Sequence, residues 1–220
     1  MTDQMKFGFD NAPKDLLDSD KPFKMEARGQ TERVAIVMFD EDKDGNLDTE
    51  HVTFVGGETH FHPDLGMILS SDEIAGLLGT GKARIGTLAL IYNTDKNGQP
   101  TKPLNFTIVP WYMDKGKFDT LREHNKVTPL AKHDLKIRAP KDKDPKFQNM
   151  EFFVQNESIW QMKPELKAKV LSKVRILAKK VQVGRKVTIE EVREKLGVDA
   201  PSASTGSESS ANFDDLIAGT

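Results

Sequence analysis

The chain has 220 residues, of which 37% are hydrophobic and 30% are charged, enough for one good-sized domain with appendages. It contains no cysteine, which excludes disulfides and thiolate metal sites and is compatible with a reducing compartment. No apolar run approaches the ~18 residues of a membrane-spanning helix, and residues 1–10 lack the pattern of a secretory signal. These features predict a soluble protein.

The net charge of −2 hides a strong asymmetry along the chain. Residues 1–100 carry 10 Lys and Arg against 18 Asp and Glu, a balance of −8. Residues 101–200 carry 22 against 13, a balance of +9, and residues 201–220 carry none against 3, a balance of −3. An asymmetry of this size indicates a polyanionic partner, and the alternative is chance clustering of charges on solvated faces.

The first third of the chain predicts an irregular arm followed by β structure. Residues 1–30 are polar and charged without a sustained period. The apolar, β-branched run 34–39 ends in an acidic turn and the chain returns through 51–55, which predicts a hairpin with a long acidic loop. Ser71 as N-cap and Gly79 near the end bracket a short helix.

Two further hairpins are expected in the middle of the chain. Residues 85–92 pair with 104–111, a helix follows over 117–124, and residues 134–138 pair with 147–155. There is no strand–helix alternation of βαβ length. Three hairpins with a helix between strands therefore predict a mixed, mainly β fold. The natural candidate is an oligonucleotide-binding (OB) barrel with inserted hairpins, followed by C-terminal helices and a disordered acidic tail.

Pro164 begins a long amphipathic helix at the first-turn position that proline tolerates. Seven Lys and Arg between 163 and 180 surround an apolar stripe at helical spacing, formed by Leu166, Val170, Val174, Leu177 and Val181. Thr188 and Glu191 form a capping box for a shorter helix that Gly197 ends. A basic helical extension thus follows the β-rich part.

The chain therefore divides into four predicted parts. Residues 1–30 form the N-terminal arm and residues 31–160 an OB-like core. Residues 161–198 form the basic helical extension. Residues 199–220 form a flexible Ser-rich linker with an acidic-hydrophobic tail, because their composition collapses into Ser, Ala, Thr and Gly.

Aromatic residues interleave with basic ones on the predicted strands and loops from Lys82 to Phe153. Single-stranded nucleic acid needs this mixture, because cations neutralise phosphates and rings stack on bases at ~1–3 kcal/mol per base. Trp111 and Tyr112, beside a proline, are expected to be partly exposed, whereas burial in the core is the alternative for the phenylalanines. The predicted nucleic-acid-binding residues are Lys82, Arg84, Tyr92, Lys102, Phe106, Trp111, Tyr112, Lys115, Lys117, Arg122, Lys136, Arg138, Lys141, Lys143, Lys146 and Phe147.

The acidic loop after residue 39 copies the start of a calcium-binding loop. Asp40, Asp42, Asp44 and Gly45 stand at the first, third, fifth and sixth positions. His51 replaces the bidentate Glu expected at position twelve, and the flanks are predicted strands rather than helices. An acidic hairpin turn is therefore the favoured interpretation.

His51, His60 and His62 are the candidate metal ligands of the chain. A His-x-His pair places both rings on one face of a strand, which suits zinc, but the spacing of the three is not distinctive. The sequence shows no Ser-His-Asp, P-loop or dinucleotide signature. We expect no metal, no cofactor and no enzymatic activity, with a His-ligated metalloprotein as the weaker alternative.

The tail combines acidic and apolar residues after the Ser-rich linker, and such a short peptide fits a groove on a partner protein. Alternatively, the tail folds back on the basic cleft and competes with nucleic acid, or it is a functionless end. The whole tail region carries only Glu208 in addition to two aspartates, so partner docking is favoured over electrostatic mimicry of DNA. The predicted partner-binding residues are Phe213, Asp214, Asp215, Leu216 and Ile217.

From Arg33 to Trp160 the order of segments resembles the replicative single-stranded-DNA-binding proteins of tailed phages, the helix-destabilising protein family. The resemblance lies in the hairpin with an Asp-Gly-Asn turn, in residues 83–92, and in Phe-Thr-Ile-Val-Pro-Trp-Tyr over 106–112 with its following helix. It continues through 134–138 and 147–153. The plan of a barrel, a Ser-rich linker and an Asp-Asp-Leu tail is also similar.

This resemblance implies an OB barrel, sequence-independent binding of single-stranded DNA, and a tail that recruits replication, recombination and repair proteins. Family members often hold a structural zinc through one His and three Cys, and this chain has His60 and His62 in that segment but no Cys. Members also often carry a basic N-terminal arm for cooperative binding, whereas residues 1–13 contain only Lys6.

The sequence thus predicts a non-enzymatic protein that binds and protects single-stranded DNA during phage DNA replication, recombination and repair. The tail would recruit partners such as a polymerase or a helicase loader, in the cytoplasm of the infected bacterial host. The main alternative is a protein-interaction factor, for example a polymerase accessory protein, that uses the basic half on an acidic partner.

Overall fold

The structure, a computed structural model, describes residues 5–7, 22–25, 27, 29–95, 99–102, 104–140 and 150–198. Contacts divide the chain into two compact units, Met1–Lys186 and Val187–Thr220. Among the described residues, no helix is long and apolar enough to cross a membrane. The first unit contains every strand and the helices α1 to α4, so it positions the predicted site.

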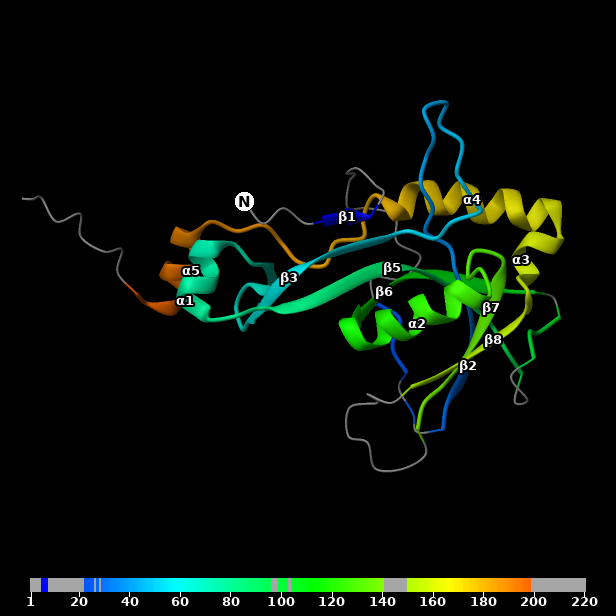
Figure 1. Cartoon of the computed structure of the whole chain (residues 1–220), viewed down its shortest axis with the longest axis horizontal. Helices are drawn as coiled ribbons and strands as arrows, with labels where there is room; N and C mark the ends of the chain where they lie inside the picture. Colours follow the sequence, from blue (N-terminus) through cyan, green and yellow to red (C-terminus); the bar gives the residue numbers. More distant parts are fainter. Residues whose placement is uncertain are drawn as a thin grey trace, which may run out of the picture. The chain divides into compact units, whose positions relative to one another are not determined.

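One sheet of eight strands, all in antiparallel pairs, forms the body of the first unit (Figure 1). The pairing order is β1-β3-β5-β2-β7-β8, with β4 paired to β3 and β6 paired to β5. The described strands do not close this sheet by pairing, so a mixed, mainly β fold is confirmed and barrel closure is not. The strands are β1 (Met5–Phe7), β2 (Thr31–Ile36), β3 (Phe54–His62), β4 (Gly66–Leu69), β5 (Lys82–Tyr92), β6 (Phe106–Asp114), β7 (His133–Arg138) and β8 (Glu151–Glu157).

Among the described residues, four helices belong to the first unit and one to the second. They are α1 (Asp72–Leu78), α2 (Lys115–Val127), α3 (Ile159–Met162) and α4 (Pro164–Ala178), and α5 (Ile189–Leu196) lies in the second unit. The ends of α1, α4 and α5 follow the predicted local chemistry. Ser71 Oγ accepts the Ile74 N–H at 3.2 Å, and Pro164 stands in the first turn of α4. Thr188 Oγ accepts the Glu191 N–H at 3.2 Å.

Strand β5 is the centre of the sheet, and β6 occupies one of its edges along nearly its whole length. The other edge pairs first with β3 and then with β2, which therefore run in the same direction. Residues 40–52 leave this edge and rejoin it (Figure 1). The predicted hairpin of 34–39 with 51–55 is wrong, apart from one bond from the Thr53 N–H to the Met38 carbonyl at 2.9 Å. Residues 34–37 bond to β5 instead, and Val55 begins the pairing of β3 with β5.

The other two predicted hairpins are confirmed as β5–β6 and β7–β8. The helix expected at 117–124 is also confirmed and extends over Lys115–Val127, because Asp114 caps it by accepting the Lys117 N–H at 2.9 Å. Within the arm predicted to be irregular, Met5–Phe7 forms a strand, β1, that pairs with β3.

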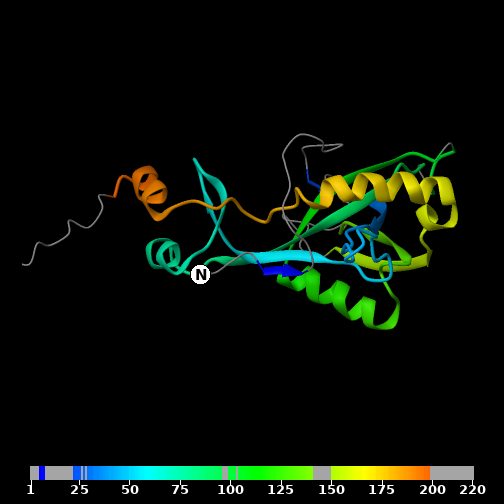
Figure 2. The ribbon, with the colours of Figure 1, turned by 90° about the horizontal axis from the view of Figure 1, so that it is seen from above.

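Hydrophobic clusters lie on both faces of the central strands, with α2 on one side and α4 on the other (Figure 2). On the α2 side, Trp111 and Leu135 are buried with Leu121 of the helix. On the α4 side, Leu88 and Ile108 pack with the stripe of the helix, of which Val170, Val174 and Leu177 are buried as predicted. Burying each such side chain contributes ~1.5–3 kcal/mol, so α4 is an integral part of the sheet unit.

Candidate nucleic-acid interface

Tyr92 lies at the centre of a buried polar network and not on a binding surface. Its side chain is fully buried, and its hydroxyl donates to Asp134 Oδ1 and accepts the Trp160 N–H, both at 3.1 Å. Arg33 Nε donates to Asp134 Oδ2 at 2.8 Å. Burial raises the pKa of the Asp134 carboxyl, while Arg33 acts in the opposite direction. The network joins β2, β5, β7 and α3, which contradicts a base-stacking role for Tyr92.

Trp111 is also a core residue, with 2% of its side chain exposed. It makes an edge contact with Phe23 and a tilted contact with Phe152, at ring-centroid distances of 5.4 and 6.2 Å. The expectation of partial exposure is wrong, because Trp111 points to the side of the sheet that α2 covers. Phe106 is half-buried on the α4 side, with Lys169 Nζ 5.8 Å from its ring centroid.

Arg84 and Tyr112 hold the segment that follows α4. The Arg84 guanidinium lies 4.4 Å from the Tyr112 ring centroid, and its Nη1 donates to the Val183 carbonyl at 3.3 Å. Gly86 permits this packing, since a Cβ there would lie 3.0 Å from Tyr112 Cε1 and 3.1 Å from Val181 Cγ1. Burial lowers the pKa of Arg84 and raises that of Tyr112. Both are therefore half-buried anchors.

Four of the predicted residues converge on one open groove of about 350 Å³, which we call the β3–β6 groove. Phe61 at the end of β3 also lines it and is 72% exposed. Lys82 is exposed and has no ion-pair partner among the described residues, whereas Lys117 Nζ pairs with Asp114 at 2.5 Å. The aromatic and basic residues that line the groove are Phe61, Lys82, Arg84, Tyr112 and Lys117.

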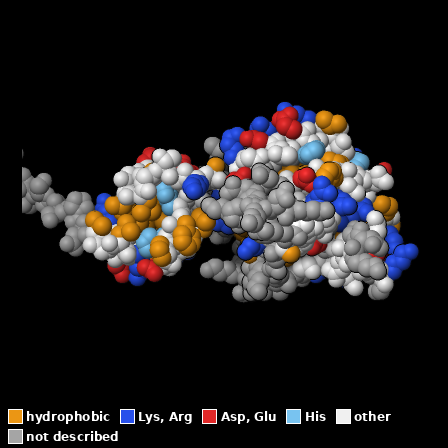
Figure 3. Space-filling view, turned by 90° about the horizontal axis from the view of Figure 1, so that it is seen from below, with side chains coloured by type: hydrophobic (Ala, Val, Ile, Leu, Met, Phe, Trp, Pro, Cys, Tyr) orange, Lys and Arg blue, Asp and Glu red, His pale blue; other side chains and the backbone are white. Residues whose placement is uncertain are grey.

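Sequence reasoning missed Phe61, although a signal for it was present. The His-x-His pattern places His60 and His62 on one face of a strand, so the residue between them must point to the opposite face. Both histidines are buried and Phe61 is exposed, as this alternation requires. In the space-filling view, hydrophobic and histidine side chains gather at the end of the sheet that carries the β3–β4 hairpin (Figure 3).

Two of the three predicted cations on α2, Lys115 and Arg122, lie at the surface in ion pairs, whereas the third, Lys117, lines the groove. Lys115 Nζ is 2.5 Å from Asp119 Oδ2, and Arg122 Nη2 is 3.1 Å from Asp119 Oδ1. The hydrogen bond from Lys115 lowers the pKa of Asp119. Lys102 is exposed in the connection between β5 and β6. Lys102, Lys115 and Arg122 do not line the β3–β6 groove.

Lys136 and Arg138 lie on β7 next to an exposed ring that the sequence analysis did not select. Phe153 of β8 is 42% exposed, pairs in register with Lys136, and has the Arg138 guanidinium 5.4 Å from its ring centroid. Arg138 Nε also donates to Glu151 Oε2 at 2.5 Å. We call these four residues the β7–β8 face.

The remaining predicted binding residues lie outside the described residues. They are Lys141, Lys143, Lys146 and Phe147 in the β7–β8 connection, and Phe213, Asp214, Asp215, Leu216 and Ile217 in the tail.

The candidate metal ligands do not converge. His60 Nε2 lies 3.0 Å from Ser70 Oγ, and His62 Nδ1 accepts the Asp64 N–H at 3.2 Å. His51 is exposed and pairs with Asp48 at 2.9 Å. Within the part of the chain that the structure describes, no group of three His, Cys, Asp or Glu side chains could hold a metal ion.

The acidic loop forms the hairpin turn that was favoured over a calcium site. Glu41 and Leu47 form a bridge, and Asp42 Oδ1 accepts the N–H groups of Asp44 and Asn46 at 2.9 and 2.8 Å. These bonds lower the pKa of Asp42, the one to Asn46 most strongly. The carboxylate therefore organises its own turn.

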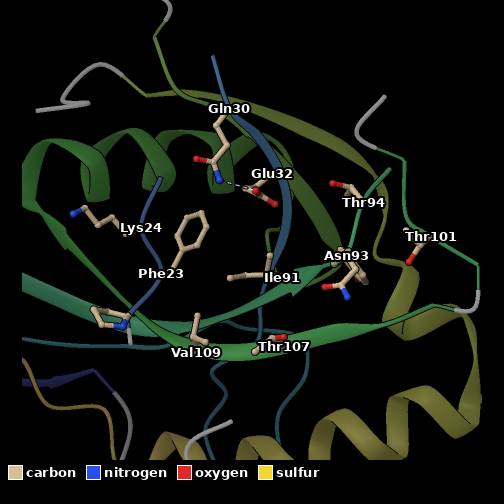
Figure 4. Close-up of a pocket in the computed structure, with 12 residues that line it drawn as sticks. Phe23, Lys24, Gln30, Glu32, Ile91, Asn93, Thr94, Thr101, Thr107 and Val109 are labelled. Carbon is tan, nitrogen blue, oxygen red and sulfur yellow. Dashed lines mark hydrogen bonds between the residues drawn. The ribbon is translucent and has the colours of Figure 1, made fainter. Parts of the chain in front are cut away.

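Another hollow, of about 700 Å³, lies at the other end of β5 and β6. Phe23, Glu32, Ile91 and Val109 surround it, and Gln30 Nε2 donates to Glu32 Oε1 at 2.8 Å (Figure 4). Its described lining contains one cation, Lys24, and one carboxylate, so it lacks the positive charge that a polyanion requires. The β3–β6 groove, lined by three cations, two rings and the carboxylate of Asp114, keeps a surplus of positive charge and is the better candidate.

Comparisons of the chain with protein-family models, curated proteins and solved structures gave no match. The geometry of the described residues is therefore the basis for the functional assignment.

Proposed function

We propose that this protein binds single-stranded DNA independently of sequence and protects it. The observation that carries the proposal is the exposed ring of Phe61 beside Lys82 and Lys117 in the β3–β6 groove. An exposed ring offers a stacking surface to any base, and nearby ammonium groups neutralise the phosphates on either side. This combination recognises unpaired bases without reading their edges.

The strand order supports an OB-type barrel as the finer description of the fold. Numbered in chain order, β2, β5, β6, β7 and β8 are five strands, and they pair in the order β6-β5-β2-β7-β8. Trp111 of β6 contacts Phe152 of β8, so side chains bridge the two ends of this path. A five-stranded, partly open barrel of this kind commonly binds oligonucleotides.

The biological setting follows the resemblance to the helix-destabilising proteins of tailed phages. In this proposal the protein is not an enzyme and coats DNA during phage replication, recombination and repair in the host cytoplasm. The tail from Phe213 to Ile217 would dock on replication proteins such as a polymerase or a helicase loader. The surplus of basic residues between 101 and 200 supports a polyanionic ligand.

The proposal is tested by fluorescence anisotropy of a labelled 16-nucleotide oligo-dT titrated with the full chain at increasing salt. Phe61→Leu keeps an apolar side chain but removes the stacking ring, so we expect a loss of ~1–3 kcal/mol, or about 5- to 150-fold in affinity. Met162→Leu is the matched control, because Met162 is 58% exposed on α3 and away from the groove, and its affinity should equal that of the wild type.

Two results would contradict the proposal: no binding by the wild type at low salt, or an affinity that does not fall with salt. Unchanged binding by Phe61→Leu, together with normal salt dependence, would instead favour the second candidate, a protein that uses its cations on an acidic partner. The observation behind that candidate is the row of exposed cations on and beside α4, which includes Lys163, Lys169 and Lys179.

A further inference from the structure

We propose that the β7–β8 face is a second contact for the same strand, at which a base stacks on Phe153 and a phosphate replaces Glu151 on Arg138. The inference rests on the proposed function and extends it. It concerns an exposed ring and a surface ion pair that the β3–β6 groove does not include.

Cross-strand register aligns the cations with the ring. Arg33 of β2 pairs with Lys136 of β7, and Lys136 pairs with Phe153 of β8. Residues directly opposite each other on antiparallel strands point to the same face, with Cβ atoms ~4.5–5.5 Å apart. A base stacked on Phe153 would therefore lie next to the side chain of Lys136, whose ammonium group can neutralise a phosphate of the same strand.

A hollow of about 670 Å³ adjoins Phe153 at the free side of β8. It runs between β8 and α2, and its lining includes His124 and Val127, the latter 85% exposed. No described strand pairs with β8 on this side. The lining of the hollow combines apolar Phe152, Val154 and Val127 with polar Thr120, Thr128 and Glu123, so an open hollow adjoins the strand that carries Phe153.

Glu151 occupies the phosphate position in the free protein. Arg138 donates to its carboxylate, and the two side chains are 42% and 50% exposed. Exposed ion pairs of this kind are weak in water, and the guanidinium fork fits phosphate as well as carboxylate. A phosphate can therefore displace Glu151 while Arg138 stays next to the Phe153 ring.

The two contacts are far enough apart to act independently. Phe153, Lys136 and Arg33 lie side by side on β8, β7 and β2. Val34, next to Arg33, pairs with Ile91 of β5, so this row of residues reaches β5 next to Tyr92. Arg84 of the β3–β6 groove lies eight residues from Tyr92 along β5, which is ~26 Å. The two contacts share no residue, so substitutions in them are expected to act additively.

The decisive experiment measures the affinity of the full chain for 16-nucleotide oligo-dT in the wild type, in Phe61→Leu and in four further variants. Glu151→Gln frees Arg138 and should bind about 2- to 5-fold more tightly. Glu157→Gln, an exposed carboxylate on the same strand, is the matched control and should change affinity by less than about 1.5-fold after salt screening. Phe153→Leu should weaken binding about 5- to 150-fold, and Phe61→Leu/Phe153→Leu should weaken it by the product of the two single losses.

The outcomes separate the two proposals. If the wild type does not bind, the proposed function fails and this inference fails with it. If the wild type binds and Phe61→Leu weakens binding, but Phe153→Leu and Glu151→Gln both equal the wild type, only the second contact is refuted. It is also refuted if the double variant loses no more than Phe61→Leu alone. Thermal unfolding of Phe153→Leu, expected to match the wild type because the ring is 42% exposed, shows that a loss is not due to misfolding.

Discussion

The buried hydroxyl of Tyr92 gives the sharpest prediction about stability. Tyr92→Phe keeps the ring and its packing but removes the one atom that satisfies two partners. The Trp160 N–H loses its acceptor, and Asp134 Oδ1 loses its donor. Asp134 keeps the bond from Arg33, so the backbone N–H of Trp160 is the group left without a partner.

The magnitude follows from these contacts. Leaving one buried donor unsatisfied costs ~1–3 kcal/mol, and a hydrogen bond to a charged acceptor is worth ~1.5–3 kcal/mol. Because both effects fall on one network, they do not add fully, and we expect the free energy of unfolding to fall by about 2–4 kcal/mol. Tyr112→Phe is the matched control, since its half-buried hydroxyl meets only the backbone of Gln182, and it should cost ~0.5–1.5 kcal/mol.

The measurement is urea-induced unfolding followed by tryptophan fluorescence, because Trp111 and Trp160 are both buried in the sheet unit. The oligo-dT affinity of folded Tyr92→Phe should equal that of the wild type. A loss of unfolding free energy no larger than that of Tyr112→Phe would refute the description of Tyr92 as the centre of a buried network. Weaker DNA binding by a fully folded variant would restore the original expectation that Tyr92 belongs to the binding surface.

Two further predictions concern packing, and both are measured by the same unfolding assay. Gly86→Ala should lower the free energy of unfolding by ~1–3 kcal/mol, because the added Cβ would press on Tyr112. Gly76→Ala in α1, where an added Cβ meets nothing within 4 Å, should raise the free energy of unfolding by ~0.5–1 kcal/mol. Leu177→Ala, at a position that is 2% exposed, should lower the free energy of unfolding by ~2–5 kcal/mol. Ile176→Ala next to it, 42% exposed, should cost less than ~1 kcal/mol. Equal costs at these two neighbours would show that α4 does not pack on the sheet.

Features set by local chemistry were predictable from the sequence. The alternation in β5 and β6, the proline that begins α4, and the caps at Ser71 and Thr188 all depend on residues within a few positions of each other. At the helix ends, the backbone groups that need a partner bond to side chains of the same segment. Such features do not depend on how the rest of the chain folds.

Features set by distant partners were not predictable. The acidic turn at 40–46 does reverse the chain, but a turn signal does not say which strand the two flanks will pair with. Both flanks found the free edge of β5, about 40 residues further along the chain. The predicted hairpin failed because β5 offers a longer continuous edge than 34–39 and 51–55 offer to each other.

The same limit explains the errors at Tyr92 and Trp111. Alternation predicts which residues share a face of a strand, but not which face will be covered. In β5 and β6 both faces are covered, by α2 on one side and by α3 and α4 on the other, so residues of either parity are buried. An aromatic side chain in the middle of these strands therefore becomes a core residue whichever way it points.

The cover that α4 provides also determines where nucleic acid could bind. On the side of the sheet that α4 covers, Phe106 is half-buried, and Tyr112 packs on the segment that follows α4. Among the described rings, Phe61 and Phe153, 72% and 42% exposed, are the accessible ones at the margins. A single exposed phenylalanine is common on protein surfaces and has no functional meaning by itself. Phe61 and Phe153 differ because each lies among cations that come from other strands, Lys82 beside the first and Lys136 beside the second. That pairing of ring and charge, repeated at two margins of one sheet, is the arrangement that a flexible polyanion with stacking bases requires.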